Sequence, residues 1–360
     1  MKFLIATGGS GGHIFPALYL AQELKARGHQ IYFAGVFGGF KVKIENEGFV
    51  CQELSARGLR TENLKSMLIS FFCMLKSIIE SLAILRKFQP DAVIGFGGYG
   101  AFPAVLMAAV LQYPTMLHEQ NVWPGRANAV LGNVVDKVAV SFENGKGFFP
   151  KKTVWTGCPC RVLRPYSVIE RENSRVAFGL AKMRYTILVF GGSQGSQAIN
   201  ANFLRTIPFL TGPLNLQVLH VAGSQGANIL NAQYNVLGLP FRVFPFLDEI
   251  DKAYAAADLV ISRAGAVTVH ELAMCRVPAI LIPYPFAGGH QTANADSLAA
   301  TGMAEVIEQK DLTPEKLREA ILRFSRRRFN EEDVRGKNRS LYRLEAAAVL
   351  ADELVALGER

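Results

Sequence analysis

Short apolar runs alternate along the chain with longer segments in which apolar residues recur every three or four positions. The chain opens in this way, with an apolar run at residues 3–6, a glycine-rich stretch at 8–12 and helical spacing over 16–24. This pattern predicts a strand, a loop and a helix. Because the succession recurs over most of the chain, it favours an α/β fold with helices covering both faces of parallel sheets.

The repeated succession falls into two similar halves. Strands are predicted at residues 3–6, 30–34, 49–53, 91–94, 115–117, 137–140 and 153–156, and then at 186–190, 217–221, 241–246, 259–262 and 278–282. Helices are predicted at residues 16–24, 65–87, 101–111, 251–257, 291–300 and 341–357, with two more ending at residues 204 and 274. Residues 161–173 are polar and charged, so we expect domains at 1–162 and 163–340, followed by a segment 341–360 whose helix could pack back across them.

Glycine-rich loops follow several predicted strands, at residues 8–12, 95–100, 191–195 and 263–268. In open parallel sheets, ligands bind outside the carboxyl ends of the strands. The polar residues that follow strands in the first half are His13, Tyr99, Glu119, Asn121 and Arg161. We expect these side chains to share one edge of a sheet, and the loops of both halves to face one cleft.

The first loop combines four glycines with His13. A helix that begins after such a loop points backbone N–H groups at an anionic ligand, and a histidine can exchange a proton near neutral pH. The dinucleotide fingerprint does not fit, because Ile14 stands at the third glycine position and no acidic residue ends the strand at 30–34. The loop therefore predicts an anion site and disfavours an NAD site.

The composition narrows the range of possible binding partners but does not select one of them. The chain has 360 residues, half of them hydrophobic, and a net charge of +9, which favours an anionic partner such as a nucleotide, a phospholipid surface or nucleic acid. The five scattered cysteines argue against a disulfide framework and indicate a reducing compartment. Cys158 and Cys160 are too close for an ordinary zinc pair, so no metal site is predicted.

The most apolar long stretch is residues 64–88. Charged residues interrupt it at Lys65, Lys76, Glu80, Arg86 and Lys87, so we expect it not to span a bilayer. The first apolar run is too short for a signal peptide. The basic run Arg326-Arg327-Arg328 is interpreted as a solvated helix face.

Five separated motifs, taken in order, resemble those of the MurG family of glycosyltransferases, and the resemblance runs from residue 1 to about residue 350. The motifs are Gly8-Gly9-Ser10-Gly11-Gly12-His13, Gly97-Gly98-Tyr99, His118-Glu119-Gln120-Asn121, Gly191-Gly192-Ser193-Gln194-Gly195 and Arg263-Ala264-Gly265-Ala266-Val267-Thr268-Val269-His270-Glu271. A single glycine loop is a weak signal, whereas all five motifs in this order are specific.

The resemblance implies the GT-B fold, in which two Rossmann-like domains face a cleft. It implies an inverting hexosyltransferase that moves N-acetylglucosamine from UDP-N-acetylglucosamine to undecaprenyl-pyrophosphoryl-N-acetylmuramyl-pentapeptide, which is lipid I. The product, lipid II, is the monomer of peptidoglycan. The family needs no cofactor or metal, has no nucleic-acid partner, and acts peripherally on the cytoplasmic side of the cell inner membrane. Residues 1–162 would face the acceptor and the membrane, and residues 163–340 would bind the donor.

The matched motifs also carry residue roles. His13 is expected to be the general base that takes the proton of the acceptor hydroxyl. Glu271 would accept hydrogen bonds from the ribose hydroxyls, Leu247 would hold the uracil through its backbone, and Tyr99 and Glu119 would lie on the acceptor side. The expected donor contacts are Ser10, Gly11, Gly12, Asn121, Arg161, Ser193, Leu247, Ala266, Val267, Thr268, Val269, His270, Glu271 and Gln291. Helix N-termini in the second half would stabilise the leaving diphosphate in place of a divalent cation.

Several of these assignments have alternatives. Tyr99 could be an ordinary loop aromatic residue, and Glu119 could cap the next segment or bind a neighbouring basic group. His118 is interpreted as a packed histidine. His270 and His290 replace residues that are usual in the family, and each could contact the ligand or face solvent. The alternative function is another GT-B glycolipid synthase that uses a different UDP-sugar. A non-enzymatic nucleic-acid-binding or membrane-binding protein is suggested by charge alone and lacks interleaved basic and aromatic residues.

The helix predicted at 65–87 has two different faces. Its large apolar residues are Leu68, Phe72, Leu75 and Ile79, and its small residues are Ser66, Ser70, Cys73 and Ser77. Each set has the spacing of one helix face. We hypothesise that the small face packs on the sheet and the large face enters the cytoplasmic leaflet, with anionic lipids meeting the flanking basic residues. The alternative is that the large face belongs to the core.

Overall fold

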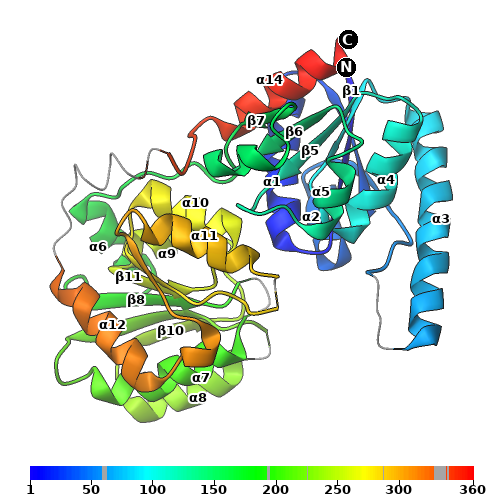
Figure 1. Cartoon of the computed structure of the whole chain (residues 1–360). Helices are drawn as coiled ribbons and strands as arrows, with labels where there is room; N and C mark the ends of the chain where they lie inside the picture. The colour runs from blue at the N-terminus through cyan, green and yellow to red at the C-terminus, as the bar shows by residue number, and fades with distance from the viewer. Residues whose placement is uncertain (59–62, 193–194, 225, 287, 328–337, 339) are drawn as a thin grey trace. The chain divides into compact units, whose positions relative to one another are not determined.

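The computed structural model shown in Figure 1 describes residues 1–58, 63–192, 195–224, 226–286, 288–327, 338 and 340–360. These residues form two compact units, one of Met1–Arg161 with Tyr342–Arg360 and the other of Val162–Leu341. The last helix of the chain therefore belongs to the N-terminal unit. Each unit has its own sheet and its own hydrophobic core.

The N-terminal unit is built on a seven-stranded sheet in the order β3-β2-β1-β4-β5-β6-β7, with every neighbouring pair parallel. Its strands are β1 Lys2–Gly8, β2 Gln30–Val36, β3 Val50–Glu53, β4 Ala92–Gly95, β5 Thr115–Glu119, β6 Lys137–Val140 and β7 Thr153–Trp155. Its helices are α1 Gly11–Ala26, α2 Lys41–Asn46, α3 Leu64–Phe88, α4 Gly98–Val110, α5 Arg126–Leu131 and α14 Ala346–Gly358, with 3₁₀ turns η1 Gly38–Phe40 and η2 Glu143–Phe148.

Side chains of β1 alternate between two helical layers. Phe3 and Ile5 pack in a core with α1 and α14, whereas Leu4 packs in a core with α3, α4 and α5. A strand that is covered on both faces needs this run of apolar residues. α14 packs against α1, and the guanidinium of Arg27, the C-cap residue of α1, donates to Asp352 on α14 at 2.5 Å.

The C-terminal unit repeats the plan with a six-stranded parallel sheet in the order β10-β9-β8-β11-β12-β13. Its strands are β8 Tyr185–Phe190, β9 Leu216–Val221, β10 Phe241–Phe244, β11 Leu259–Ser262, β12 Ala279–Leu281 and β13 Ala304–Val306. Its helices are α6 Val168–Ala177, α7 Gln197–Thr206, α8 Ala227–Leu237, α9 Ile250–Ala256, α10 Ala266–Cys275, α11 His290–Ala299 and α12 Pro314–Arg326, with 3₁₀ turns η3 Ile207–Phe209 and η4 Gln309–Asp311.

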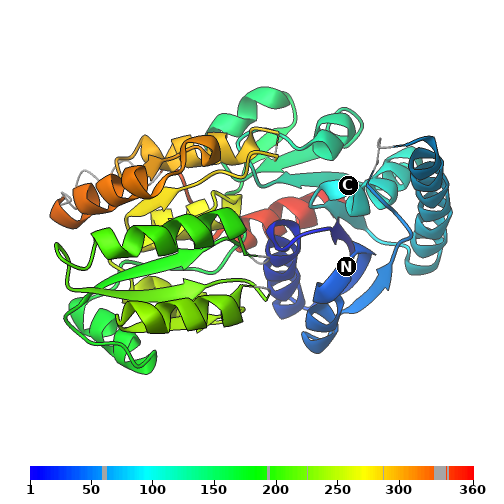
Figure 2. The same cartoon turned by 90° about the horizontal axis from the view of Figure 1, so that it is seen from below.

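Helices lie on both sides of this second sheet, as Figure 2 shows. Ile187 and Val189 of β8 pack in a core with α7, α8 and α12. The helices α6, α9, α10 and α11 form a second packed set, in which α9 contacts β8. Two Rossmann-like units with parallel sheets confirm the predicted α/β fold class.

Strand order reverses beside the first strand of each sheet. The order is β2-β1-β4 in the N-terminal unit and β9-β8-β11 in the C-terminal unit. Loops on the two sides of such a reversal turn towards opposite faces, which makes it the place where open sheets bind ligands. The four predicted glycine loops follow β1, β4, β8 and β11, so they lie at these two reversal points.

Several elements lie outside the predicted set. α6 begins inside the segment predicted as a domain boundary, where Ser167 and Glu170 form a reciprocal capping box. α12 begins with Thr313 as its cap and Pro314 in its first turn. Both are recognisable helix starts, so the sequence carried signals for these helices. β13 has three residues, pairs only at the edge of the sheet and carries the charged Glu305 at its centre, so it lacks the apolar run that predicted the other strands.

By length and composition alone, α3 is long and apolar enough to cross a membrane between Lys65 and Phe88. Charge interrupts the helix less than predicted, because Lys65, Arg86 and Lys87 lie at its ends. The expectation that it does not span a bilayer stays a prediction. Length and composition do not decide how the helix is used. Its surroundings in the N-terminal unit are more informative.

The two faces of α3 have different environments. Ser70 and Ser77 are buried, whereas the large apolar residues are exposed, with 64% exposure at Phe72 and 68% at Ile79. The hydroxyl of Ser70 donates to the carbonyl oxygen of Gly58 at 3.2 Å, so this face is tied to the unit. The predicted inward direction of the small face is confirmed at these two serines, and the alternative that the large face is core is wrong.

Candidate active site

Three strand ends, those of β1, β4 and β5, are neighbours at the carboxyl edge of the N-terminal sheet. His13, in the first turn of α1, lies against Gly98, where a Cβ atom would be 3.4 Å from the imidazole Cδ2. Gly98 also has a φ of +75°, so its backbone favours glycine as well. The exposed ring of Tyr99 lies beside Gly9 and Gly58. The structure thus brings His13 and Tyr99 together at this edge.

The imidazole of His13 is attached to buried side chains behind it. Its Nδ1 lies 3.0 Å from Oε1 of Gln120. The side-chain nitrogen of Gln120 lies 3.1 Å from Nδ1 of His118 and 3.0 Å from the carbonyl oxygen of His118. Nε2 of His118 lies 3.1 Å from the carbonyl oxygen of Gly157. His118 and Gln120 are buried and His13 is partly exposed, so the network runs from the core to the edge of the sheet.

The carboxylate of Glu119 is bound to the loop that follows β5. Oε1 accepts from the backbone N–H of Asn121 at 2.9 Å and from its side chain at 3.0 Å. Oε2 accepts from the backbone of Gly125 at 2.9 Å and from the side chain of Asn128 at 2.8 Å. Glu119 is buried, and these bonds shape its own loop. Its placement fits the capping alternative, and the predicted position on the acceptor side gains no support from it.

The other predicted residues of the N-terminal unit lie on two segments. Ser10 and Gly12 are exposed at the start of α1 and Gly11 is buried, and the Ser10 hydroxyl makes no capping bond to its helix. Backbone N–H groups in the first turn of α1 therefore depend on another acceptor. Arg161 is partly exposed at the end of the N-terminal unit, after β7.

In the C-terminal unit, the loop after β8 closes at Gly195. Gly195 has a φ of +76°, and a Cβ atom there would lie 2.4 Å from the carbonyl oxygen of Ala222, so only glycine fits. The hydroxyl of Ser196 then caps α7 by accepting from the backbone N–H of Ile199. Ser193, a predicted donor contact, lies outside the described residues.

α10 begins directly after the β11 loop. Its cap residue, Gly265, makes no side-chain capping bond, and the first turn holds no acidic residue. The N–H groups of Ala266, Val267 and Thr268 have no intrahelical acceptor, and the partial positive charge of this helix end suits an anion. Val267 and Thr268 are partly exposed, whereas Val269 is buried in the core.

Two neighbouring side chains of α10 have different surroundings. The buried carboxylate of Glu271 accepts at Oε2 from the hydroxyl of Tyr254 on α9, at 3.0 Å. This bond holds an acceptor group in a fixed direction. His270 is buried as well, and its Nδ1 lies 2.7 Å from the carbonyl oxygen of Ala266. The ring of His270 faces the preceding turn of its own helix, so the predicted donor contact of this side chain gains no support.

Arg263, in the β11 loop, is a buried cation bound to neutral acceptors. Its guanidinium donates to the carbonyl oxygens of Ile282 and Pro283, each at 3.1 Å. It also donates to the hydroxyl of Ser196 at 2.8 Å and to Oε1 of Gln309 at 2.6 Å. Burial lowers the pKa of Arg263 from its ordinary value, although an arginine stays charged at neutral pH. One positive charge thus joins the segments that follow β8, β11, β12 and β13.

Gln291 and Leu247 lie on two further segments. Oε1 of Gln291 accepts from the backbone N–H groups of Ala264 at 3.2 Å and Tyr284 at 2.9 Å, so the side-chain NH₂ is the group available as a donor. Leu247 is partly exposed after β10. His290 begins α11, and its buried Nδ1 has no hydrogen-bond partner among the described residues.

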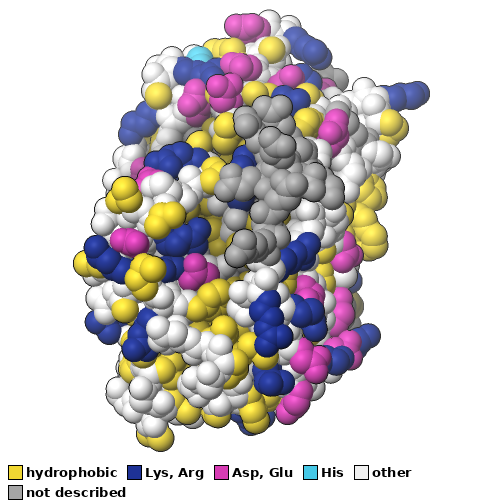
Figure 3. Space-filling model, turned by 90° about the vertical axis from the view of Figure 1, so that its left-hand side faces the viewer, with side chains coloured by type: hydrophobic (Ala, Val, Ile, Leu, Met, Phe, Trp, Pro, Cys, Tyr) yellow, Lys and Arg dark blue, Asp and Glu magenta, His cyan; other side chains and the backbone are white. Residues whose placement is uncertain are grey.

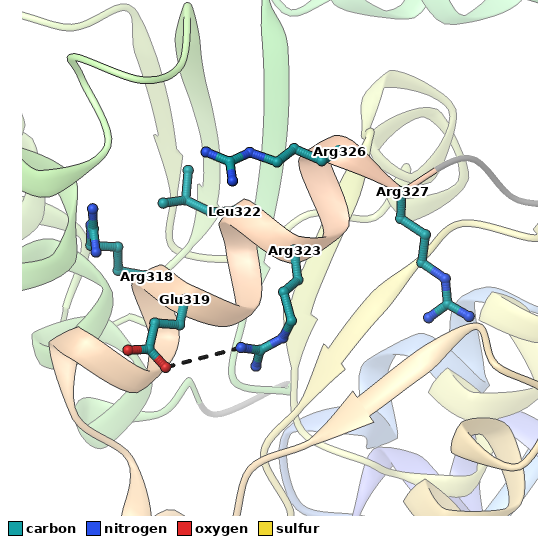
Figure 4. Close-up of a pocket in the computed structure, with 6 residues that line it drawn as sticks. All are labelled: Arg318, Glu319, Leu322, Arg323, Arg326 and Arg327. Atoms are coloured by element: carbon teal, nitrogen blue, oxygen red, sulfur yellow. Dashed lines mark ion pairs between the residues drawn. The ribbon is translucent and has the colours of Figure 1, made fainter.

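A separate basic surface is formed by α12 and its C-cap residue, Arg327. A shallow hollow on it is lined by Arg318, Glu319, Leu322, Arg323, Arg326 and Arg327 (Figure 4). Arg323 pairs with Glu319 at 4.0 Å and with Glu305 at 2.5 Å. Basic and acidic side chains are interspersed over the side of the molecule that Figure 3 shows. The exposed Arg326 fits the predicted solvated face, and Arg328 lies outside the described residues.

Three residues make contacts at these sites although no role was predicted for them from the sequence. They are Gln120, Arg263 and Tyr254. Gln120 and Arg263 stand inside two of the motifs, so their position beside assigned residues was a usable signal. Tyr254 reaches Glu271 from another helix, and no local pattern indicates that contact. Over the described residues, no group of three His, Cys, Asp or Glu side chains is placed to hold a metal ion.

Comparison with known proteins covers nearly the whole chain. Residues 3–140 match the glycosyltransferase family 28 N-terminal domain, and residues 186–349 match the glycosyltransferase family 28 C-terminal domain. The chain is 36% identical to a protein of Syntrophus aciditrophicus (strain SB), with 99% of each chain covered. That protein is named UDP-N-acetylglucosamine--N-acetylmuramyl-(pentapeptide) pyrophosphoryl-undecaprenol N-acetylglucosamine transferase.

Comparison with solved structures agrees with the sequence comparison. MurG of Acinetobacter baumannii matches with a TM-score of 0.75 and 30% identity, and 99% of each chain is covered. CalG4, the calicheamicin glycosyltransferase, matches with a TM-score of 0.71, covering 100% of this chain and 98% of its own. Its identity is 17%, so that likeness shows the fold alone.

Proposed function

The chain belongs to the MurG family of glycosyltransferases, and we propose that it transfers N-acetylglucosamine from UDP-N-acetylglucosamine to undecaprenyl-pyrophosphoryl-N-acetylmuramyl-pentapeptide. The product is lipid II for peptidoglycan synthesis. The observation that carries this proposal is the 36% identity over 99% of both chains, since it spans the His13 loop and the α10 loop alike. The protein is accordingly a hexosyltransferase.

His13 is the proposed general base. The acceptor hydroxyl gives its proton to Nε2 of His13 while its oxygen attacks the anomeric carbon of the donor. The bond from that carbon to the diphosphate breaks on the opposite side, and UDP leaves with the electron pair, so the configuration inverts. A positioned base contributes about 10²–10⁴-fold to such a rate. The partly exposed imidazole, held from behind by Gln120, supports this role.

The C-terminal unit is proposed to bind the donor. The uncapped N–H groups at the start of α10 would meet the diphosphate, and the charge of Arg263 would strengthen their attraction for it. The carboxylate of Glu271 would accept from the ribose hydroxyls, while the backbone at Leu247 would contact the uracil. The NH₂ group of Gln291 would orient the sugar. The bond from Tyr254 to Glu271 supports this assignment, because it fixes the carboxylate before the ligand binds.

We also propose a peripheral location on the cytoplasmic face of the inner membrane. An enzyme that acts on an undecaprenyl-linked acceptor has to approach the bilayer. The exposed apolar face of α3 supports this proposal, since it presents Phe72 and Ile79 to solvent. Lys65, Lys76 and Arg86 on the same helix could meet anionic headgroups, each contributing about 1 kcal/mol.

The transfer reaction is tested with radiolabelled donors. The purified chain is mixed with lipid I or a lipid-linked analogue and, in separate reactions, with UDP-N-acetylglucosamine, UDP-N-acetylgalactosamine or UDP-glucose. We expect labelled lipid II from UDP-N-acetylglucosamine. Transfer from only one of the other sugars would favour the alternative glycolipid synthase, and no transfer from any donor would contradict the proposal.

The membrane contact is tested with the double variant Phe72→Ser/Leu75→Ser. It should reduce co-sedimentation with anionic liposomes and leave UDP affinity and thermal unfolding unchanged, because both side chains are exposed. The matched control is Val168→Ser/Ile169→Ser on α6, where both residues are 71% exposed. Equal liposome binding by the wild type and the α3 variant would place the contact elsewhere.

A further inference from the structure

The hydrogen bonds behind His13 form one uninterrupted chain. It runs from the carbonyl oxygen of Gly157 to His118 at 3.1 Å, from His118 to Gln120 at 3.1 Å, and from Gln120 to His13 at 3.0 Å. The two middle residues are buried, and the ring of Phe96 lies 5.2 Å from that of His118. The chain therefore lies in the packed interior of the N-terminal unit, where its members have little freedom to turn.

The order of donors along the chain follows from the chemistry of its first member. A carbonyl oxygen can only accept, so the nitrogen of His118 that faces Gly157 must carry a hydrogen. In a neutral imidazole the other nitrogen, Nδ1, is then an acceptor. The end of the Gln120 side chain that faces it must be the NH₂ group.

A second contact fixes the Gln120 amide independently. The same side-chain nitrogen lies 3.0 Å from the backbone carbonyl oxygen of His118. If the amide were turned over, its oxygen would face two acceptors, so the turned orientation is excluded on both counts. The amide oxygen must therefore point at His13, and Nδ1 of His13 must carry the hydrogen that it accepts.

We propose that His118 and Gln120 are positioning residues that hold His13 in the tautomer with Nδ1 protonated, so that the unprotonated Nε2 faces the acceptor hydroxyl. This inference rests on the proposed role of His13 as the base. During transfer, the hydroxyl proton moves to Nε2 and His13 becomes an imidazolium. Its Nδ1–H then makes a charge-assisted, stronger bond to the amide oxygen of Gln120. After UDP leaves, the Nε2 proton is released to solvent and the neutral tautomer returns.

Other titratable groups surround the chain. Glu119 has both oxygens bound to its own loop, and Tyr99 reaches the same edge from α4. The neutral amide of Gln120 cannot accept the proton, so it orients His13 without competing for it. In this respect it differs from a carboxylate partner, which would add a negative charge beside the imidazole.

The first test measures the tautomer of His13 directly in the wild-type protein. With ¹⁵N-labelled histidine, long-range ¹H–¹⁵N correlation spectra distinguish the two tautomers of each of the six histidines, and the signal lost in His13→Ala identifies His13. We expect His13 in the wild type, without substrates, to carry its hydrogen on Nδ1. A wild-type His13 with its hydrogen on Nε2 would overturn the inference. This readout does not use the transfer reaction, so a failure of the proposed function remains distinguishable from a failure of the tautomer lock.

The second test compares Gln120→Leu, Gln120→Glu and a control variant in the transfer assay. Gln120→Leu removes the acceptor for Nδ1–H, and we expect kcat to fall by about 10- to 100-fold, part of what a general base supplies. Gln120→Glu restores an acceptor and should recover most of that loss. The acidic limb of the pH–rate profile of Gln120→Glu should lie at higher pH than that of the wild type, because a carboxylate favours the imidazolium form of His13.

The matched control is Gln217→Leu. Gln217 is also buried, and its amide also bridges a backbone carbonyl and a side chain, Ala181 at 2.7 Å and Thr186 at 2.9 Å, but in the C-terminal unit. It should lose stability to a similar extent while keeping kcat, measured at a temperature where all variants are folded. If Gln120→Leu keeps the wild-type kcat and His13 tautomer, or if Gln217→Leu loses as much activity, the inference is wrong.

Discussion

Each unit buries a histidine in a strand and bonds both of its ring nitrogens, but the two networks end differently. In the C-terminal unit, Nδ1 of His220 lies 2.8 Å from the hydroxyl of Tyr234, and Nε2 lies 3.0 Å from Oδ1 of Asn200. The side chain of Asn200 then donates to the carbonyl oxygen of Ala222 at 3.0 Å. All of these groups are buried, so this network is closed within the core.

The network of the N-terminal unit is open at one end. It starts at His118, which is as deeply buried as His220, and it ends at the partly exposed His13. A closed network can only stabilise the fold, whereas an open one can control a group that meets a ligand. Under the proposed role of His13, burial of a histidine does not by itself separate structural from functional roles, because the residue at the end of the network decides.

The largest effect is expected at the open end. His13→Ala should lower the rate of transfer by about 10²–10⁴-fold, because it removes the proposed base. UDP affinity should be unchanged, since the side chain of His13 is not among the expected donor contacts. Single-turnover transfer and calorimetric titration with UDP measure the two quantities separately. A variant that turns over at nearly the wild-type rate with normal pH dependence would show that His13 is structural.

The closed network should instead affect how the stability of the fold depends on pH. Burial lowers the pKa of His220 to about 3, whereas an unfolded histidine titrates near 6.5. Below pH 6.5 the unfolded chain binds a proton that the folded chain does not. The contribution of His220 is therefore complete above pH 6.5 and declines as the pH falls towards 3, by about 1.4 kcal/mol per pH unit. At pH 5 this amounts to roughly 2 kcal/mol.

Hydrogen exchange in β9 measures this effect within the C-terminal unit. Tryptophan fluorescence would instead report unfolding of the N-terminal unit, because both tryptophans, Trp123 and Trp155, belong to it. His220→Gln removes the titrating group, so its stability should be lower at pH 7.5 but should change less between pH 7.5 and 5. Equal pH dependence in the wild type and the variant would contradict the assignment.

A smaller effect is expected at the proposed donor site of the C-terminal unit. Glu271→Ala should raise the donor KM about tenfold with little change in kcat, because hydrogen bonds to the ribose are made equally in the ground and transition states. Tyr254→Phe should raise KM less, since it only frees the carboxylate. Initial rates at varied donor concentration provide both constants. An unchanged donor KM in Glu271→Ala would end this assignment.

Local patterns were sufficient for most of the fold. The strand–glycine loop–helix successions after β1, β4, β8 and β11 were predicted, because apolar runs and clustered glycines act within a few residues of one another. α6 and α12 lie outside the predicted set although Ser167 and Thr313 are readable caps, because both helices are largely polar and lack a long apolar run. The final helix begins at Ala346, five residues later than predicted.

The sequence by itself determined that His13 follows a glycine loop at the carboxyl edge of a parallel sheet, and that an acidic residue, Glu271, follows the start of a helix in the second half. Only the tertiary structure decided what the neighbours of these residues do. Glu119 and Gln120 are adjacent, yet Glu119 binds its own loop while Gln120 turns to His13, 107 residues away. The physical reason is that a side chain's role depends on the acceptors and donors that surround it. The long-range packing of strands and helices supplies those partners, and no local pattern records them.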